Sequence, residues 1–204
     1  MRRVPIIAII LIGWALGFVS NGLAAPKKLS GIPLIWKPTS SASDYGVLNL
    51  TDASRARIEI RELADARAKP ELIGENRDKE DEGILLPVTT SEKPAAFITE
   101  RLRRIFSDAG LDIVDSGGDI VVSGEVKRFF VLETSSYQGE VNLSITVKGK
   151  KGAILWSGAA GGAATRFGRS YKAENYYEAL SDSLMDTAYK LLQNEEFVKA
   201  LAGK

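Results

Sequence analysis

Alternation of apolar and polar residues marks the strands of this sequence. The clearest case covers residues 141–147, where Val, Leu or Ile stands at every second position and Asn, Ser or Thr stands between them. A period of two is typical of a strand with one buried face. Residues 57–61 alternate charged and apolar side chains in the same way, and residues 119–132 are rich in Val and Phe. A further strand is predicted from 153 to 164, after a hairpin turn over 149–152.

Two longer segments carry apolar residues at the spacing of an amphipathic helix. In residues 95–109, apolar side chains recur on one face and charged side chains fill the other positions. Pro94 suits the first turn of a helix, where its missing N–H is not needed, and Gly110 is a typical residue after the last turn. The second helix is predicted over 173–193, and a short helical segment follows over 195–201.

The first residues of the chain have the three parts of a secretory signal peptide. Arg2 and Arg3 form a short cationic start, and residues 4–19 are uncharged and mostly apolar. Residues 20–25 follow, and all of them except Leu23 are small or polar. The apolar run is short for a membrane span, which needs about 20 residues. We therefore expect residues 1–24 to direct export, and the mature protein to reside in the periplasm.

The cleavage site of this signal peptide is predicted after Ala24. Cleavage after Ala25 would place Pro26 next to the bond to be cut, where its ring should hinder hydrolysis. The alternative is a segment that is not cleaved and that anchors the protein in the inner membrane.

The rest of the chain divides into two parts. Residues 25–56 are predicted to be irregular, with a possible short strand at Ile32–Trp36, and residues 57–204 to form one α+β domain. We expect a mainly antiparallel sheet of about four to five strands, with the two amphipathic helices packed on one face. The strands on either side of helix 95–109 are candidates for parallel pairing through a crossover. The highly charged residues 75–83 are predicted to be an exposed loop.

The composition excludes several classes of chemistry. The 204 residues include neither Cys nor His. The chain therefore has no disulfide, no thiolate nucleophile and no Ser-His-Asp triad, and it lacks the usual ligands of zinc. We predict no catalytic residue, no cofactor and no metal site. With 27 basic and 26 acidic residues, the chain gives no electrostatic reason to expect a nucleic acid partner.

Two local patterns have competing interpretations. The Gly- and Ala-rich residues 157–165 lack the Lys-Ser/Thr pair of a phosphate-binding loop. Their small side chains indicate either close approach by another backbone or helix, or an edge that pairs with a partner. Four carboxylates on or beside predicted strands could serve a glycoside hydrolase if a pair of them lay about 5 to 9 Å apart. They are Asp119, Glu125, Glu133 and Glu140.

Aromatic residues supply the candidate partner contacts. Tyr171 and Tyr176 lie around the start of the last long helix, and Phe129 and Phe130 are adjacent in a predicted strand. One of the two phenylalanines should face the core and the other the surface. We predict Phe129, Tyr171 and Tyr176 as contacts for a partner, because exposed aromatic residues often anchor interfaces. The alternative for all of them is packing within the domain.

The order of these features resembles the YajG family of bacterial envelope lipoproteins. The resemblance covers about residues 57–201. It rests on Ile58-Glu59-Ile60 followed by Asp65-x-Arg67 and Ile73-Gly74, on Ala109-Gly110-Leu111, on the stretch from Asp119 to Val126, on Trp156-Ser157-Gly158, on the Tyr171 to Tyr177 segment and on Asn194 to Leu201. It implies an α+β fold and an envelope location, and no catalytic residues.

The sequence departs from that family at one place. Leu23-Ala24-Ala25-Pro26 is similar to a lipoprotein processing site, but it has proline where the lipidated cysteine belongs. No stable lipid anchor is therefore expected. We expect an exported, non-enzymatic envelope protein that binds a protein, glycan or lipid partner. The alternatives are an accessory factor of an envelope assembly or transport machine and a carboxylate-dependent glycan hydrolase.

Overall fold

The computed structural model describes residues 28–78, 80–168 and 170–204. The predicted signal peptide, with its cleavage residues Ala24 and Ala25, lies outside these residues. No helix in the described part of the chain is both long enough and apolar enough to cross a membrane.

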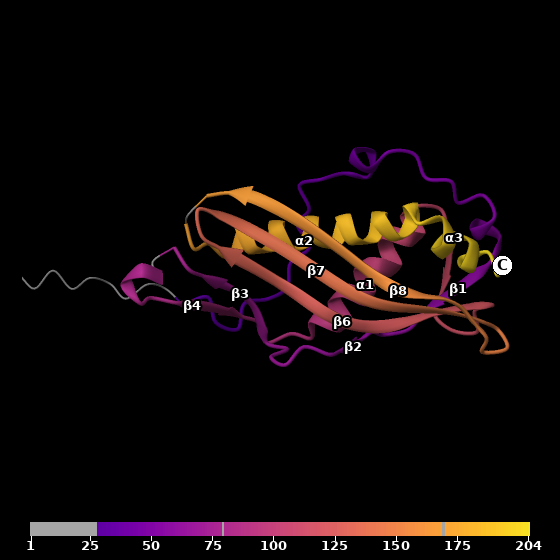
Figure 1. The fold of residues 1–204 in the computed structure, drawn as a ribbon, viewed down its shortest axis with the longest axis horizontal. Helices are drawn as coiled ribbons and strands as arrows, with labels where there is room; N and C mark the ends of the chain where they lie inside the picture. The colour runs from indigo at the N-terminus through magenta and orange to yellow at the C-terminus, as the bar shows by residue number, and fades with distance from the viewer. Residues whose placement is uncertain (1–27, 79, 169) are drawn as a thin grey trace, which may run out of the picture.

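The described residues form one mixed sheet of eight strands (Figure 1). Three strands of 14 residues make an antiparallel meander in the order β6-β7-β8. On the other side of β6, the short strands β1, β2 and β3 pair with it in parallel, β5 pairs in parallel with β1, and β4 pairs antiparallel with β3. The strands are β1 Arg57–Ile60, β2 Ala64–Asp65, β3 Leu72–Asn76, β4 Leu86–Thr89, β5 Asp112–Val114, β6 Ile120–Glu133, β7 Ser136–Gly149 and β8 Ile154–Phe167.

The α+β class is confirmed, but the expected four to five strands were an undercount. The strands missing from the prediction are β2, β3, β4 and β5, which have two to five residues each. Unlike residues 57–61, these segments show no clear alternation of apolar and polar residues, and these strands are defined by pairing with β6, β1 or β3. The first two residues of the expected loop at 75–83 belong to β3. Glu80–Glu82 of the same segment form a 3-10 turn, η3.

The three helices agree closely with the predicted ranges. They are α1 Pro94–Asp108, α2 Ala173–Gln193 and α3 Glu195–Leu201. Pro94 is in the first turn of α1, as expected. The chain breaks between α2 and α3 at Asn194, whose side chain accepts a hydrogen bond from the Phe197 N–H at 2.9 Å. This is a typical N-cap contact, and it starts α3 in a new direction.

The helices cover one face of the sheet, and the other face of the meander is open to solvent (Figure 1). Along β7, the residues at odd positions from 137 to 147 are buried, while the polar residues between them are partly exposed. A two-layer fold of this kind needs only one apolar side per strand, which explains the clean alternation of residues 141–147.

Small residues let α2 lie directly against β7 and β8. A Cβ atom at Gly162 would come within 2.3 Å of the Ser183 carbonyl oxygen, and one at Gly139 within 2.5 Å of the Ala179 carbonyl oxygen. Ala179, Ser183 and Thr187 follow at intervals of four residues and so form one narrow stripe of the helix. The Gly- and Ala-rich strand therefore serves close approach of a helix, which is one of the two interpretations of its sequence.

Residues 28–56 wrap around the outside of the domain. The possible strand at Ile32–Trp36 is reduced to an isolated bridge between Ile32 and Thr90. The chain then follows the outer side of α2 toward the end of the molecule that holds the C-terminus (Figure 1). It forms two short 3-10 turns, η1 at Ala42–Tyr45 and η2 at Ala53–Arg55. We call residues 37–52 the strap.

Candidate functional site

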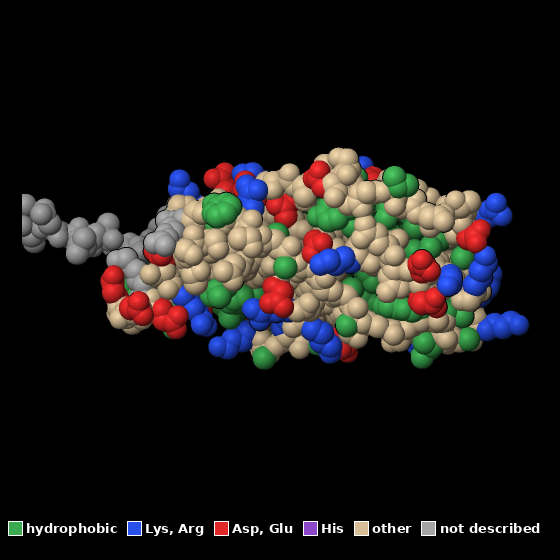
Figure 2. All heavy atoms as spheres, turned by 45° about the horizontal axis from the view of Figure 1, so that its top comes forward, with side chains coloured by type: hydrophobic (Ala, Val, Ile, Leu, Met, Phe, Trp, Pro, Cys, Tyr) green, Lys and Arg blue, Asp and Glu red, His purple; other side chains and the backbone are tan. Residues whose placement is uncertain are grey.

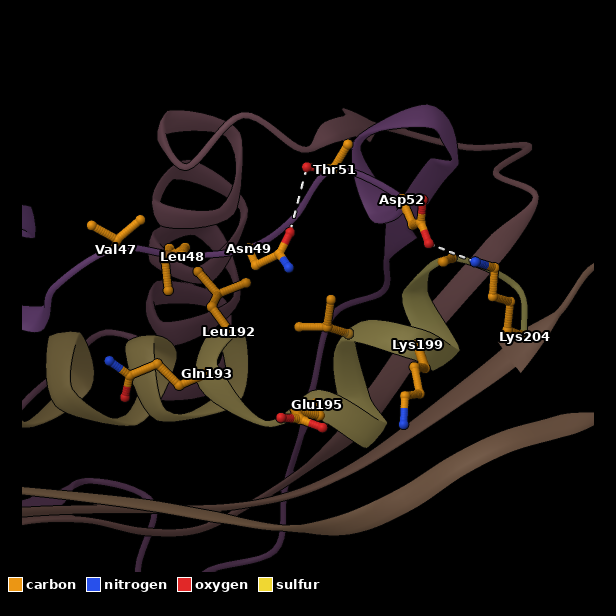
Figure 3. Close-up of a pocket in the computed structure, with 12 residues that line it drawn as sticks. Val47, Leu48, Asn49, Thr51, Asp52, Leu192, Gln193, Glu195, Lys199 and Lys204 are labelled. Carbon is orange, nitrogen blue, oxygen red and sulfur yellow. Dashed lines mark hydrogen bonds and ion pairs between the residues drawn. The ribbon is translucent and has the colours of Figure 1, made fainter.

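The strap and the C-terminal helices enclose an open cleft of about 700 Å³ (Figure 3). The strap forms one wall, and the last turn of α2, α3 and the C-terminal residue form the other. We call this hollow the strap cleft. Its lining residues are Val47, Leu48, Asn49, Thr51, Asp52, Leu192, Gln193, Glu195, Val198, Lys199, Ala202 and Lys204.

Upstream of the cleft, a buried carboxylate holds the strap on α2. Asp182 accepts four hydrogen bonds, from the backbone N–H and the hydroxyl of both Thr39 and Ser40, at 2.6 to 2.9 Å. Burial alone would raise the pKa of Asp182, but these hydrogen bonds outweigh it and hold the pKa below its usual value. Four hydrogen bonds to the Asp182 carboxylate therefore attach the strap to the middle of α2.

A second contact fixes the strap where the cleft begins. The rings of Tyr45 and Tyr189 stack with centroids 4.4 Å apart and an angle of 6° between their planes. The side-chain amide of Gln193 donates a hydrogen bond to the Tyr45 carbonyl oxygen at 2.6 Å. Burial raises the pKa of both tyrosines above its ordinary value. This part of the strap is a rigid edge of the site.

Beyond the cleft, the strap returns to the core. Leu50 and Ala53 are buried, and the Lys204 ammonium lies 2.5 Å from a carboxylate oxygen of Asp52. The hydrogen bond and charge of Lys204 lower the pKa of Asp52. The strap is thus fastened on both sides of the cleft.

Between these two attachments, the strap has backbone groups without hydrogen-bond partners among the described residues. The peptide groups of residues 46–49 make no hydrogen bond with any other described residue. Val47 is fully exposed at the rim of the cleft, whereas Leu192 is buried in its floor (Figure 3). Gly46 has a φ of +78°, which permits the turn at the start of this stretch. Four residues without regular secondary structure therefore lie beside the cleft with backbone N–H and C=O groups that no other described residue bonds.

Most of the side chains that line the cleft are polar or charged. The lining supplies two amides, two carboxylates, two ammonium groups and one hydroxyl. Lys199 forms a 2.8 Å ion pair with Glu196, whose hydrogen bond raises the pKa of Lys199. The Thr51 hydroxyl donates to the side-chain oxygen of Asn49 at 3.4 Å. The partner of that hydroxyl among the described residues is therefore an amide oxygen, which is not a base.

The structure moves two of the three predicted contact residues into the core. Phe129 and Tyr176 are both fully buried, so the expectation that they lie on the surface was wrong. The neighbour of Phe129, Phe130, takes the partly exposed position instead. Alternation places adjacent residues on opposite faces of a strand, but it does not say which face the helices cover.

Tyr171 and Tyr176 bind the same buried carboxylate. The Tyr176 hydroxyl donates to Glu133 at 2.7 Å, and the Tyr171 backbone N–H donates to the other oxygen of Glu133 at 2.9 Å. Burial and the contact with Glu133 raise the pKa of Tyr176 well above its ordinary value. Tyr171 has a φ of 43° and is partly exposed, and its hydroxyl donates to the Pro87 carbonyl oxygen and accepts from the Leu29 N–H, both at 3.2 Å. Tyr171 and Tyr176 therefore connect the start of α2 to the end of β6, to β4 and to the first described residues.

The four carboxylates weighed for hydrolysis do not meet. Glu133 is buried on the helix side of the sheet, and Asp119 pairs with Lys150. Glu125 lies opposite Ser144 on β7, four residues from Glu140, which corresponds to a separation of about 13 Å along the strand. That distance exceeds the spacing of the carboxylate pairs in glycoside hydrolases. Glu125 and Glu140 instead form ion pairs with Lys127 and Arg128.

Comparison with known proteins gives a fold and no sequence relative. No protein-family model matches the chain, and a search of curated proteins finds no match. A crystal structure from Xanthomonas campestris, of a protein of the DUF330 family, is similar with a TM-score of 0.51 and 15% identity, over 81% of this chain and 89% of that one. At this identity the likeness concerns the fold alone.

Two further structures score lower. A Caulobacter crescentus protein, provisionally described as a lipoprotein, has a TM-score of 0.42 and 13% identity over 54% of this chain and 84% of its own. A dodecameric PelC variant from Paraburkholderia phytofirmans has a TM-score of 0.34 and 17% identity over 68% of this chain and 87% of its own. We base the similarity on the Xanthomonas campestris structure, with which the chain shares its α+β fold.

Proposed function

We propose that this chain is an exported, non-enzymatic envelope protein that binds an extended polypeptide segment of a partner in the strap cleft. The main support for the proposal is the composition and shape of the strap cleft. It combines an open volume of about 700 Å³, an apolar floor, charged groups of both signs and a stretch of unpaired backbone. Each of these features is complementary to a peptide chain.

The unpaired backbone favours a peptide most directly. An extended peptide can add beside exposed N–H and C=O groups as an extra strand, and then places alternate side chains into pockets below it. Residues 46–49 offer N–H and C=O groups of this kind, and the partly exposed Leu48 and Val198, together with the buried Leu192, supply the apolar part of the lining. The strap is held at Tyr45 and at Leu50, so little ordering is needed when the partner binds.

The lining is less suited to the other two classes of partner. Sugar rings commonly stack on aromatic side chains, and the cleft has no aromatic residue in its lining. An acyl chain needs a continuous apolar channel, whereas this lining includes Asp52, Glu195, Lys199 and Lys204. The mixed charges match a segment that carries both acidic and basic side chains.

Export and envelope location rest on the sequence. The cationic start, the apolar run and the small residues up to Ala25 support a secretory signal. The resemblance to YajG-like envelope proteins and the fold shared with the DUF330 protein are compatible with that location. Fractionation of producing cells, with intact-mass measurement of the protein, tests location and cleavage together.

Site-specific photo-crosslinking tests the cleft. A photoreactive phenylalanine analogue replaces Val47 at the rim, and in a matched protein it replaces Thr165, which is exposed on the open face of the sheet. Crosslinking is carried out in cells that export the protein, and adducts are identified by mass spectrometry. We expect one main adduct from position 47 and none of the same mass from position 165.

A blocked cleft provides the control. The Ala202→Trp substitution fills part of the cleft from its α3 side and should remove the adduct at position 47. A synthetic peptide that covers the crosslinked region of the partner should then bind the unsubstituted protein in a fluorescence anisotropy titration, and should bind the Ala202→Trp protein at least tenfold more weakly. Equal adducts from positions 47 and 165, or an adduct that persists with Ala202→Trp, would refute the proposal.

A further inference from the structure

The position of the first described residues shows where the N-terminal segment joins the domain. The Thr89 N–H donates to the Leu29 carbonyl oxygen at 3.0 Å, and the Ile32 N–H donates to the Thr89 carbonyl oxygen at 2.9 Å. Ile32 pairs with Thr90 in the parallel direction. By the same register, residue 28 lies level with Leu86, the first residue of β4. The chain therefore comes into the domain at the end of the sheet where β4 begins.

Strand pairing brings the end of β8 to the same end of the sheet. Leu86 of β4 pairs with Asn76 of β3, and Asn76 pairs with Glu133 at the end of β6. Across the β6–β7 turn, Ser136 pairs with Phe167, the last residue of β8. The segments before β4 and after β8 thus lie along one end of the molecule, four strands apart.

Large apolar side chains are exposed along this end. Phe167 is 94% exposed, Leu85 47% and Ile84 37%, and they are three of the six exposed large hydrophobic residues in the described part of the chain. Single exposed apolar residues are common on soluble proteins. Here three of them lie at the end of the molecule where the apolar N-terminal segment joins the domain, which indicates a contact surface. We call this region the Phe167 end.

The length of the connecting chain limits how far this end can lie from the apolar segment. The uncharged region of the sequence ends at Pro26, and Leu29 is already fixed by Thr89 and by the Tyr171 hydroxyl. From Ala25 to Leu29, four residues reach at most about 14 Å when fully extended. In the alternative in which residues 4–25 are not cleaved and anchor the protein in a membrane, this short connection keeps the Phe167 end near the bilayer surface.

We infer that the Phe167 end is a membrane-contact surface, with Phe167, Leu85 and Ile84 inserted in the interfacial region of the bilayer. Apolar contact is the basis of this interaction. Acidic side chains gather over η3 at the same end, at Glu80, Asp81 and Glu82, so attraction to anionic lipid is not its source (Figure 2). Aromatic rings are favoured in the membrane interface, which suits Phe167.

The absence of cysteine from the chain makes a direct test possible. Single substitutions Phe167→Cys and Leu85→Cys each carry an environment-sensitive fluorophore, and the labelled full chain is reconstituted in phosphatidylcholine vesicles. Val47→Cys is the matched control, because Val47 is fully exposed beside the far end of α2. A helix of 21 residues spans about 30 Å, so this label should stay in water. Intact mass verifies that residues 1–25 are retained.

We expect blue-shifted emission and quenching by a lipid-borne quencher at positions 167 and 85, and neither change at position 47. Equal behaviour at all three positions, or no shift at 167 and 85, would overturn the inference. A shift at position 167 without vesicles would also overturn it, and would assign this end to a second copy of the chain or to the chain's own apolar segment. The outcome is independent of peptide binding, because the strap cleft lies at the other end of α2.

Discussion

The sheet meander with α2 and the strap on its outer side are fixed by different kinds of contact. The meander is a continuous apolar layer, in which every second residue of β7 is buried and α2 lies within contact distance of the strand backbone. The strap is held at separate points, by Asp182, by Tyr45 and by the buried Leu50 and Ala53. The first arrangement packs helix against strand without space for larger side chains at Gly139 and Gly162, and the second leaves the backbone of residues 46–49 without a hydrogen-bond partner among the described residues.

This difference predicts unequal responses to substitution. At Gly139 and Gly162 of the meander, an added methyl group would meet the backbone of α2, so helix and strand would have to move apart. In the strap the loss of one attachment should free a segment and leave the fold in place. The effects below are ordered from the largest to the smallest.

The largest effect is expected for Gly162→Ala in β8. The new Cβ would lie 2.3 Å from the Ser183 carbonyl oxygen and 2.4 Å from the Thr187 nitrogen, so α2 must shift away from the sheet. Overpacking of this kind costs about 3 kcal/mol. Urea denaturation measures the loss in free energy of unfolding. Ala159→Val, on the exposed side of the same strand, is the control and should change stability by less than about 0.5 kcal/mol. Similar losses in both proteins would mean that helix contact does not restrict β8.

The second effect concerns the junction at Glu133. Tyr176→Phe removes the hydroxyl that donates to this buried carboxylate at 2.7 Å. The unpaired oxygen should cost about 2 kcal/mol of stability. Tyr177→Phe is the matched change one residue along α2. The Tyr177 hydroxyl donates no hydrogen bond to a described residue, so we expect this change to lower the free energy of unfolding less than half as much. Thermal or urea denaturation compares the two proteins, and equal losses would contradict the role given to Glu133.

The same contrast explains how far the sequence could predict the molecule. The range of α2 and the middle of β7, at 141–147, follow from patterns repeated over seven or more residues, which need no knowledge of neighbours. Residues 136–140 of β7 and 165–167 of β8 lay outside the predicted strands. The two residues of β2 become a strand only because β6 offers a free edge. The burial of Phe129 depends on which face of β6 the helices cover, and a single strand does not contain that information. The strap cleft joins residues 47–52 to residues 192–204, which no local pattern connects.

The third effect tests the strap through pH. The pKa of Asp182 is lower in the folded protein than its usual value, so ionised Asp182 stabilises the fold above the unfolded-state pKa of about 4. This contribution should be lost as the pH falls through the lower, folded-state pKa. Asp182→Asn should cost about 1 to 2 kcal/mol at pH 7, and the difference from the unsubstituted protein should disappear in acid. Urea denaturation at a series of pH values provides the measurement. A difference that stays constant down to pH 3 would rule out this ionised contact.

The smallest effect is expected at the C-terminal side of the cleft. Lys204 and Asp52 are both exposed, and ion pairs of this kind contribute about 0 to 1 kcal/mol, less in high salt. Lys204→Gln should therefore change the free energy of unfolding by less than about 0.5 kcal/mol. The buried Leu50 and Ala53 still hold the strap there, so crosslinking from position 47 should persist. The comparison with Asp182→Asn then separates the two attachments. If Lys204→Gln alone abolished the adduct while stability was unchanged, Lys204 would be a direct contact of the bound peptide instead of a support of the cleft wall.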